Sequence, residues 1–157
     1  MKILVVYYSR TGTTKNVAEA ISGRLNGCIE EIKDNKNREG IINYMLSGWE
    51  AARGKTPEIK EINNSPGKFD LVVIGTPVWA ASMASPVRTY INKQKKNIKN
   101  YALFCTYKGS GADKTFAKMK NELEKEPKAT MDIIDKEINN DSYLNKITEF
   151  IKKVKEN

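Results

Sequence analysis

The stretch that decides the fold is residues 1–21, MKILVVYYSRTGTTKNVAEAI. Its segment Ile3–Tyr8 is a nearly continuous run of apolar and β-branched residues, which is typical of a buried parallel strand. Asn16–Leu25 then repeats apolar residues at the spacing of an amphipathic helix. A strand that passes almost directly into a helix indicates an α/β fold.

The loop between this strand and this helix carries four hydroxyl side chains around one glycine and no acidic residue. Such a loop presents free backbone N–H groups and the positive end of the helix dipole. It has neither the Gly-Lys-Ser/Thr of a P-loop nor the Gly-x-Gly-x-x-Gly of a dinucleotide fold. The alternative is that its threonines only cap the helix. We predict a phosphate-binding loop made of Ser9, Arg10, Thr11, Gly12, Thr13 and Thr14.

Strand and helix patterns alternate five times along the chain. After the first pair, strands are predicted at Cys28–Ile32, Phe69–Gly75, Tyr101–Tyr107 and Ala129–Ile134, and helices at Ile41–Ala52, from an N-cap at Ser85, at Ala112–Leu123 and from Asp141 onward. This alternation demands parallel strands joined by right-handed crossovers. The predicted fold is a doubly wound α/β sandwich that forms a single domain over residues 1–157.

The predicted helix at Ile41–Ala52 carries a broad apolar stripe. The stripe consists of Ile41, Ile42, Met45, Leu46, Trp49 and Ala52. Such a stripe is more often packed into a core than used for binding, so we predict that it faces the sheet. A subunit contact or one wall of a substrate pocket is the alternative.

Composition excludes several classes of protein. No stretch approaches eighteen consecutive apolar residues, and the predicted strand begins too early to leave room for a signal peptide, so we expect a cytoplasmic protein without a membrane span. Cys28 and Cys105 both lie in apolar, strand-like surroundings, which favours reduced core thiols. The chain has no histidine, so hydrolysis by a histidine base and zinc chemistry are poor candidates.

The formal net charge of +8 is unevenly distributed. Leu71–Ala112 contains no Asp or Glu, and its cations are Arg88, Lys93, Lys95, Lys96, Lys99 and Lys108. Nucleic-acid binding is not favoured, because no aromatic residues are interleaved with the lysines. Lys93–Lys99 is interpreted as a solvated helix end, with attraction to acidic partners as the alternative.

Three loops are predicted to meet at one edge of the sheet. They follow the first, third and fourth predicted strands, and ligands of such sheets bind at the carboxyl ends of the strands. In the second loop, Thr76–Ser85, Trp79 offers a flat ring for stacking, although a core position is the alternative. In the third loop, Thr106–Gly111, the glycines permit close approach to a ligand or make an ordinary turn. None of the loops contains an acid, which argues against Mg²⁺ binding and against a phospho-acceptor domain.

These loops resemble those of the flavodoxin family, and the resemblance extends over essentially the whole chain. It implies a five-stranded parallel sheet of order 2-1-3-4-5 with helices on both faces. It also implies FMN as cofactor, with its phosphate in the hydroxyl-rich loop. By the same resemblance, the flavin ring is bordered by Pro77, Val78, Trp79 and Ala80, and flanked on its other side by Thr106, Tyr107, Lys108, Gly109 and Gly111.

The chain departs from the family pattern in two respects. Flavodoxins that carry electrons are generally acidic, whereas the corresponding half of this chain is cationic. Lysines near the flavin would stabilise its reduced anion and raise its potential. The family often has a glycine after the loop aromatic, but here Trp79 is followed by Ala80 and Ala81, for which a positive φ is costly.

Two functions are compatible with these features. The first is a non-catalytic, monomeric FMN electron carrier that serves redox partner proteins, which the basic surface suggests are acidic. The second is an FMN-dependent NAD(P)H:quinone or flavin reductase, with a substrate pocket walled by Tyr44, Trp49 or Met83. A module that has lost its ligand is a third, weaker alternative. The short chain favours the carrier, while the basic surface favours the reductase.

Overall fold

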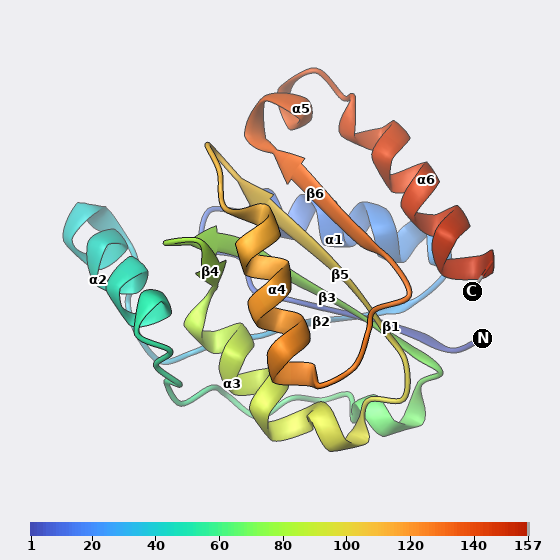
Figure 1. The fold of residues 1–157 in the computed structure, drawn as a ribbon, viewed down its shortest axis with the longest axis horizontal. Helices are drawn as coiled ribbons and strands as arrows, with labels where there is room; N and C mark the ends of the chain where they lie inside the picture. Colours follow the sequence, from blue (N-terminus) through green and yellow to red (C-terminus); the bar gives the residue numbers. More distant parts are fainter. Residues whose placement is uncertain (157) are drawn as a thin grey trace.

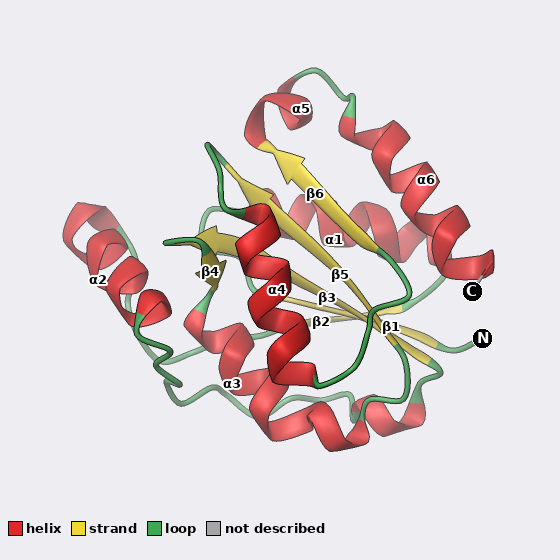
Figure 2. Cartoon of the chain, in the orientation of Figure 1, coloured by secondary structure: helices red, strands yellow, loops and turns green. Residues whose placement is uncertain are grey.

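The computed structural model describes residues 1–156, which form one central parallel sheet covered by helices on both faces (Figures 1 and 2). Its strands are β2 (Cys28–Glu31), β1 (Ile3–Tyr7), β3 (Leu71–Trp79), β5 (Tyr101–Tyr107) and β6 (Thr130–Ile134), in that spatial order. The predicted order 2-1-3-4-5 is therefore confirmed. The labels differ because a two-residue strand, β4 (Ser82–Met83), pairs antiparallel with the end of β3 outside this path.

The helices divide between the two faces of the sheet. One face is covered by α1 (Thr13–Leu25) and α6 (Tyr143–Glu156), and the other by α3 (Ser85–Gln94) and α4 (Ala112–Leu123). The helix α2 (Gly40–Ala52) stands beside the sheet rather than across it, at one side of the molecule (Figure 1). A short helix, α5 (Asp135–Asn139), and two 3₁₀ turns, η1 (Pro66–Lys68) and η2 (Lys95–Asn97), complete the chain.

The core explains why the strands are apolar on both faces. In β1, Val5 packs with α1 and α6, whereas Leu4 and Val6 pack with α3 and α4, and all three side chains are fully buried. A strand that alternates between two buried faces has no solvent side, so its sequence becomes a continuous apolar run. No helix within residues 1–156 is long and apolar enough to cross a membrane.

The prediction that the apolar stripe of α2 packs into the core is wrong. Ile41 is 80% exposed, Ile42 76%, Met45 68%, Leu46 53% and Trp49 50%, and Ala52 is also exposed. The buried face of the helix carries Ser47 and Ala51 instead. These small side chains let the helix approach a buried arginine, described below, and this approach turns the apolar stripe outward.

Two further local predictions need correction. Cys105 is fully buried as predicted, but Cys28 is exposed because it begins β2 at the edge of the sheet. Burial raises the pKa of the Cys105 thiol well above its ordinary value. Ser85 is the first residue of α3 rather than its N-cap, which is Ala84. The strand β4 and the helix α5 were not predicted, because each is too short to show periodicity.

The close packing of β3 against β5 gives a test of the core. Gly75 lies opposite Phe104 in the strand register, and a Cβ at Gly75 would overlap the Phe104 ring. We expect Gly75→Ala to lower the free energy of unfolding by about 1–3 kcal/mol, measured by urea denaturation. Gly23→Ala is the matched control, since Gly23 lies on the exposed face of α1 and a Cβ there has open space. It should stabilise by about 0.5–1 kcal/mol, and a neutral Gly75→Ala would contradict the packing.

Candidate functional site: a cavity at the carboxyl edge of the sheet

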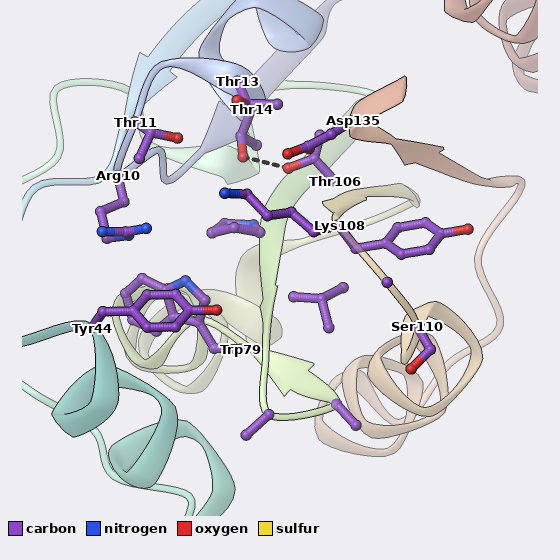
Figure 3. A pocket seen from close by; sticks show the side chains of 16 residues that line it. Arg10, Thr11, Thr13, Thr14, Tyr44, Trp79, Thr106, Lys108, Ser110 and Asp135 are labelled. Atoms are coloured by element: carbon purple, nitrogen blue, oxygen red, sulfur yellow. Dashed lines mark hydrogen bonds between the residues drawn. The ribbon is translucent and has the colours of Figure 1, made fainter. Parts of the chain in front are cut away.

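A cavity of about 340 Å³ opens at the carboxyl ends of β1, β3 and β5 (Figure 3). We call it the central cavity. Its walls are formed by Arg10, Thr11, Thr13, Thr14, Tyr44, Pro77, Val78, Trp79, Ala80, Ala81, Thr106, Tyr107, Lys108, Gly109, Ser110 and Asp135. All three predicted loops contribute, because parallel strands deliver their following loops to one edge of the sheet.

The hydroxyl loop, residues 9–14, turns into α1 at the cavity. Gly12 takes the N-cap position with φ +94°, and its N–H donates a 3.1 Å hydrogen bond to the Ser9 hydroxyl. This backbone conformation is one that favours glycine. The Thr11 and Thr13 hydroxyls line the cavity and make no hydrogen bond within residues 1–156. The loop therefore presents free hydroxyl groups beside the N-terminus of a thirteen-residue helix.

Thr14 of the same loop forms a hydrogen bond within the protein. Its side chain is buried and shares a 2.8 Å hydrogen bond with the Thr106 hydroxyl (Figure 3). This contact joins the first predicted loop to the third, across ninety-two positions of the sequence. The two loops are thus held together by the protein itself before any ligand is considered.

Two cations face the cavity from opposite sides. The Arg10 guanidinium lies over the Tyr44 ring of α2, 4.7 Å from its centroid. Figure 3 shows the Lys108 side chain extending across the cavity toward the hydroxyl loop. Together with the start of α1, these charges make the hydroxyl-loop end of the cavity suitable for an anion.

Trp79 forms a cavity wall but is not the exposed platform that the sequence suggested. Its side chain is 4% exposed, and its ring packs edge-on against Tyr8, with centroids 5.4 Å apart. The guanidinium of Arg38 lies 5.2 Å from the Trp79 centroid. Burial, with the nearby Asp34 carboxylate, raises the pKa of Tyr8 to about 12. Core neighbours therefore fix the ring in place. Trp79 is both a core residue and part of the cavity wall, so both interpretations of the sequence hold in part.

Arg38 also attaches α2 to the body of the protein. It pairs with Asp34 at 2.6 Å and with Glu50 of α2 at 2.8 Å, and it donates to the Ser47 hydroxyl at 2.9 Å. Burial alone would lower the pKa of Arg38, but its bonds to Glu50 and Asp34 raise it overall. We call these contacts the Arg38 network.

The end of β3 and β4 form a tight hairpin at the rim of the cavity. Its two turn residues, Ala80 and Ala81, have φ values of +48° and +53°, as in a type I′ turn. The positive φ that sequence reasoning considered costly for alanine is therefore present at both positions. The Thr76 hydroxyl accepts a 2.9 Å bond from the Ala84 N–H, and Arg88 donates to the Ser82 hydroxyl at 2.9 Å. These bonds hold the hairpin in place.

The third predicted loop contributes Thr106 to Ser110 to the cavity wall. The Tyr107 hydroxyl donates to Asp132 at 2.8 Å, and this bond raises the pKa of Tyr107 to about 12. Gly111 does not line the cavity, because it caps α4 with φ +107° and lies against the hairpin. A Cβ at Gly111 would come within 3.0 Å of the Ala81 Cα, so this glycine is required by close packing.

Sequence reasoning missed Asp135. This half-buried carboxylate begins α5, directly after β6, and it is the one acid among the described residues that line the cavity. It makes no hydrogen bond or ion pair within residues 1–156. Asp135 follows the predicted strand Ala129–Ile134. The rule that ligands bind at the carboxyl ends of parallel strands therefore also points to Asp135.

Twelve of the fifteen predicted binding residues line the central cavity. The remaining three, Ser9, Gly12 and Gly111, are not part of the wall and shape the loops from behind. Of the predicted pocket walls, Tyr44 lines the cavity, Met83 is fully buried and Trp49 points to solvent. Residues 1–156 contain no cluster of three His, Cys, Asp or Glu side chains that could hold a metal.

Comparison with known proteins agrees with this geometry. Residues 2–154 match the family described as flavodoxin. No match was found among curated proteins. A flavoprotein from Lactobacillus acidophilus NCFM, solved in complex with FMN, has a TM-score of 0.73 at 24% identity, over 88% of this chain and 97% of that one.

More distant structures share the same fold. A flavodoxin from the domain Archaea has a TM-score of 0.55 at 18% identity, and the alignment covers 98% of this chain and 99% of that one. The rubredoxin oxygen:oxidoreductase of Desulfovibrio gigas has a TM-score of 0.58 at 13% identity, with 98% of this chain and 36% of that one covered.

The hairpin at the cavity rim generates a prediction about stability. Ala80→Gly relieves a left-handed conformation that is costly for alanine, but it also loosens the unfolded chain. We expect a net gain of about 0.5–1 kcal/mol in the free energy of unfolding, measured by thermal and urea denaturation. Ala117→Gly on the exposed face of α4 is the control and should lose about 1 kcal/mol. Equal losses for both variants would show that Ala80 is not strained.

Proposed function

The chain belongs to the flavodoxin family, and on that premise we propose that it carries electrons between partner proteins on a non-covalently bound FMN. The observation that supports this function most is the convergence of three loops on one cavity with a positively charged, donor-rich end that suits an anion. FMN combines a phosphate, a polyol chain and a planar ring. Each of these parts finds matching residues in the central cavity.

The phosphate fits the end of the cavity formed by the hydroxyl loop. Thr11 and Thr13 offer free hydroxyl donors, and the first turn of α1 offers backbone N–H groups. Arg10 and Lys108 add positive charge from two sides.

The ring fits the apolar part of the wall. Pro77, Val78 and Trp79 come from the end of β3, and Ala80 continues them into the hairpin. Because the Arg38 network and Tyr8 hold Trp79 from behind, the position of this wall is fixed by the protein's own contacts. A preformed wall lowers the ordering cost of binding a flat aromatic ring.

Asp135 supports a ligand that carries hydroxyl groups. An ionised carboxylate accepts hydrogen bonds and cannot donate them. Every other charged or hydroxyl side chain on the wall can act as a donor, so a ligand with only acceptors would leave Asp135 unsatisfied. The polyol chain of FMN supplies O–H donors for this carboxylate.

FMN supplies one- and two-electron transfer, and the protein's residues hold and orient it. The surrounding walls exclude water from one side of the site, and Lys108 places a positive charge beside it. No side chain is required to take part in covalent chemistry.

One observation favours the second candidate, an FMN-dependent NAD(P)H:quinone or flavin reductase. A smaller pocket of about 240 Å³ adjoins the central cavity between α2 and the hairpin. It is lined by Tyr44, Met45, Gly48, Trp79 and Ala80. A small apolar acceptor would fit such a pocket, so we retain the reductase as the alternative.

Thr13→Ala tests the phosphate position. The variant removes one donor that no protein group uses, so FMN should bind about five- to tenfold more weakly, while riboflavin should be unaffected. Quenching of flavin fluorescence measures both dissociation constants. Thr14 is unsuitable for this test because its loss would also break the bond to Thr106. Equal weakening of FMN and riboflavin would place the phosphate elsewhere.

Asp135→Ala tests the polyol contact. Riboflavin, which has the polyol chain without the phosphate, should bind about tenfold more weakly, because a charge-assisted acceptor is lost. Lumiflavin has the ring alone and should bind equally well to both proteins. The same fluorescence titration measures both ligands. If lumiflavin is weakened as much as riboflavin, Asp135 shapes the ring site and does not bind the polyol.

A further inference from the structure

The outward face of α2 is the largest apolar feature exposed on a single helix of the described chain. We define the α2 face as Ile41, Ile42, Met45, Leu46 and Trp49, each at least half exposed. Isolated apolar residues are common on protein surfaces, but a contiguous group of large ones marks an interaction site.

Cations flank the α2 face. The Arg53 guanidinium lies 4.9 Å and the Lys55 ammonium 5.9 Å from the centroid of Trp49. At the cavity side, Arg10 lies over Tyr44. Of the nearby acids, Glu50 is neutralised by Lys36 and the Arg38 network, and Glu39 remains at the opposite end of the helix. The face is therefore apolar at its centre and predominantly positive at its edge.

The α2 face continues directly into the central cavity. Tyr44 is half exposed on α2 and also lines the cavity. Met45 belongs to the α2 face and lines the smaller pocket, which shares Trp79 and Ala80 with the cavity wall. A protein bound to α2 would thus lie against the wall that encloses the cofactor site.

The lysine-rich segment Lys93–Lys99 lies at the opposite edge of the sheet. It includes η2, which precedes β5, whereas the cavity lies beyond the end of β5. The seven residues of β5 extend about 23 Å, and Lys95 is paired with Glu124. This segment, which sequence reasoning considered for acidic partners, is therefore too distant to bring a partner to the cavity.

We propose that the α2 face is the docking surface for an acidic electron-transfer protein that presents an apolar centre ringed by carboxylates. This inference rests on the proposed function, because only a redox partner gains from lying beside the cofactor. Charge complementarity identifies the occupant: Arg53 and Lys55, beside Trp49, attract carboxylates. Two copies of this chain, each with a net charge of +8, would instead repel each other.

The experiment measures electron transfer from the reduced, FMN-loaded protein to two protein acceptors by stopped flow. Rubredoxin is the acidic acceptor and cytochrome c the basic one. As salt rises from about 20 to about 300 mM, transfer to rubredoxin should slow and transfer to cytochrome c should not. Ile42→Gln with Leu46→Gln should reduce the rubredoxin rate about tenfold at every salt concentration. These residues line neither pocket.

Charge variants provide the matched control. Arg53→Gln with Lys55→Gln should lower the low-salt rate to rubredoxin and flatten its salt dependence. Lys93→Gln with Lys96→Gln removes the same charge at the opposite edge and should leave the rate unchanged. Benzoquinone, a small acceptor, should be reduced equally by all variants, and circular dichroism checks that α2 remains folded.

Several outcomes would overturn the docking proposal. One is an electron-transfer rate to rubredoxin that rises with salt. Another is a wild-type rate of transfer to rubredoxin in the variant Ile42→Gln with Leu46→Gln. A mass that doubles at micromolar concentration in sedimentation, and is restored to the monomer by Ile42→Gln with Leu46→Gln, would assign the face to a second copy. Co-sedimentation with phosphatidylserine vesicles would assign it to a membrane. Failure to bind FMN is read from flavin absorbance before any acceptor is added, and it would overturn the proposed function itself.

Discussion

The site depends on one geometric constraint: parallel strands deliver every following loop to the same edge of the sheet. The hydroxyl loop, the hairpin after β3, the loop after β5 and Asp135 after β6 meet there for this reason. The hydrogen bond between Thr14 and Thr106 then joins two of these loops directly. A cavity with one donor-rich end and one apolar wall follows from this arrangement.

The Arg38 network is the second feature on which the molecule depends. A buried arginine is costly unless its charge and donors are matched, and here Asp34, Ser47 and Glu50 match them. The same guanidinium lies against Trp79, so one side chain supports the cavity wall and holds α2. Because polar bonds rather than apolar packing attach α2, its apolar residues remain available to a partner.

The sequence predicts the sheet well because buried parallel strands are continuous apolar runs and because the loop rule depends only on strand direction. It fails at α2, where periodicity identifies an apolar face but cannot say whether a sheet or a partner covers it. It fails at Cys28, because apolar, strand-like surroundings predict burial although the implied strand order already puts this strand at the edge of the sheet. The role of Arg38 could not be predicted either, because its contacts with Trp79 and Glu50 join distant parts of the chain.

The most direct test of the carrier function is an anaerobic mixture of the FMN-loaded protein with NADPH and then with NADH, followed by flavin absorbance. An electron carrier should show no bleaching with either nucleotide. It should then be reduced by dithionite and reoxidised by a protein acceptor. Rapid bleaching by NADPH or NADH, with reoxidation by a quinone, would contradict the carrier function and identify the protein as a reductase.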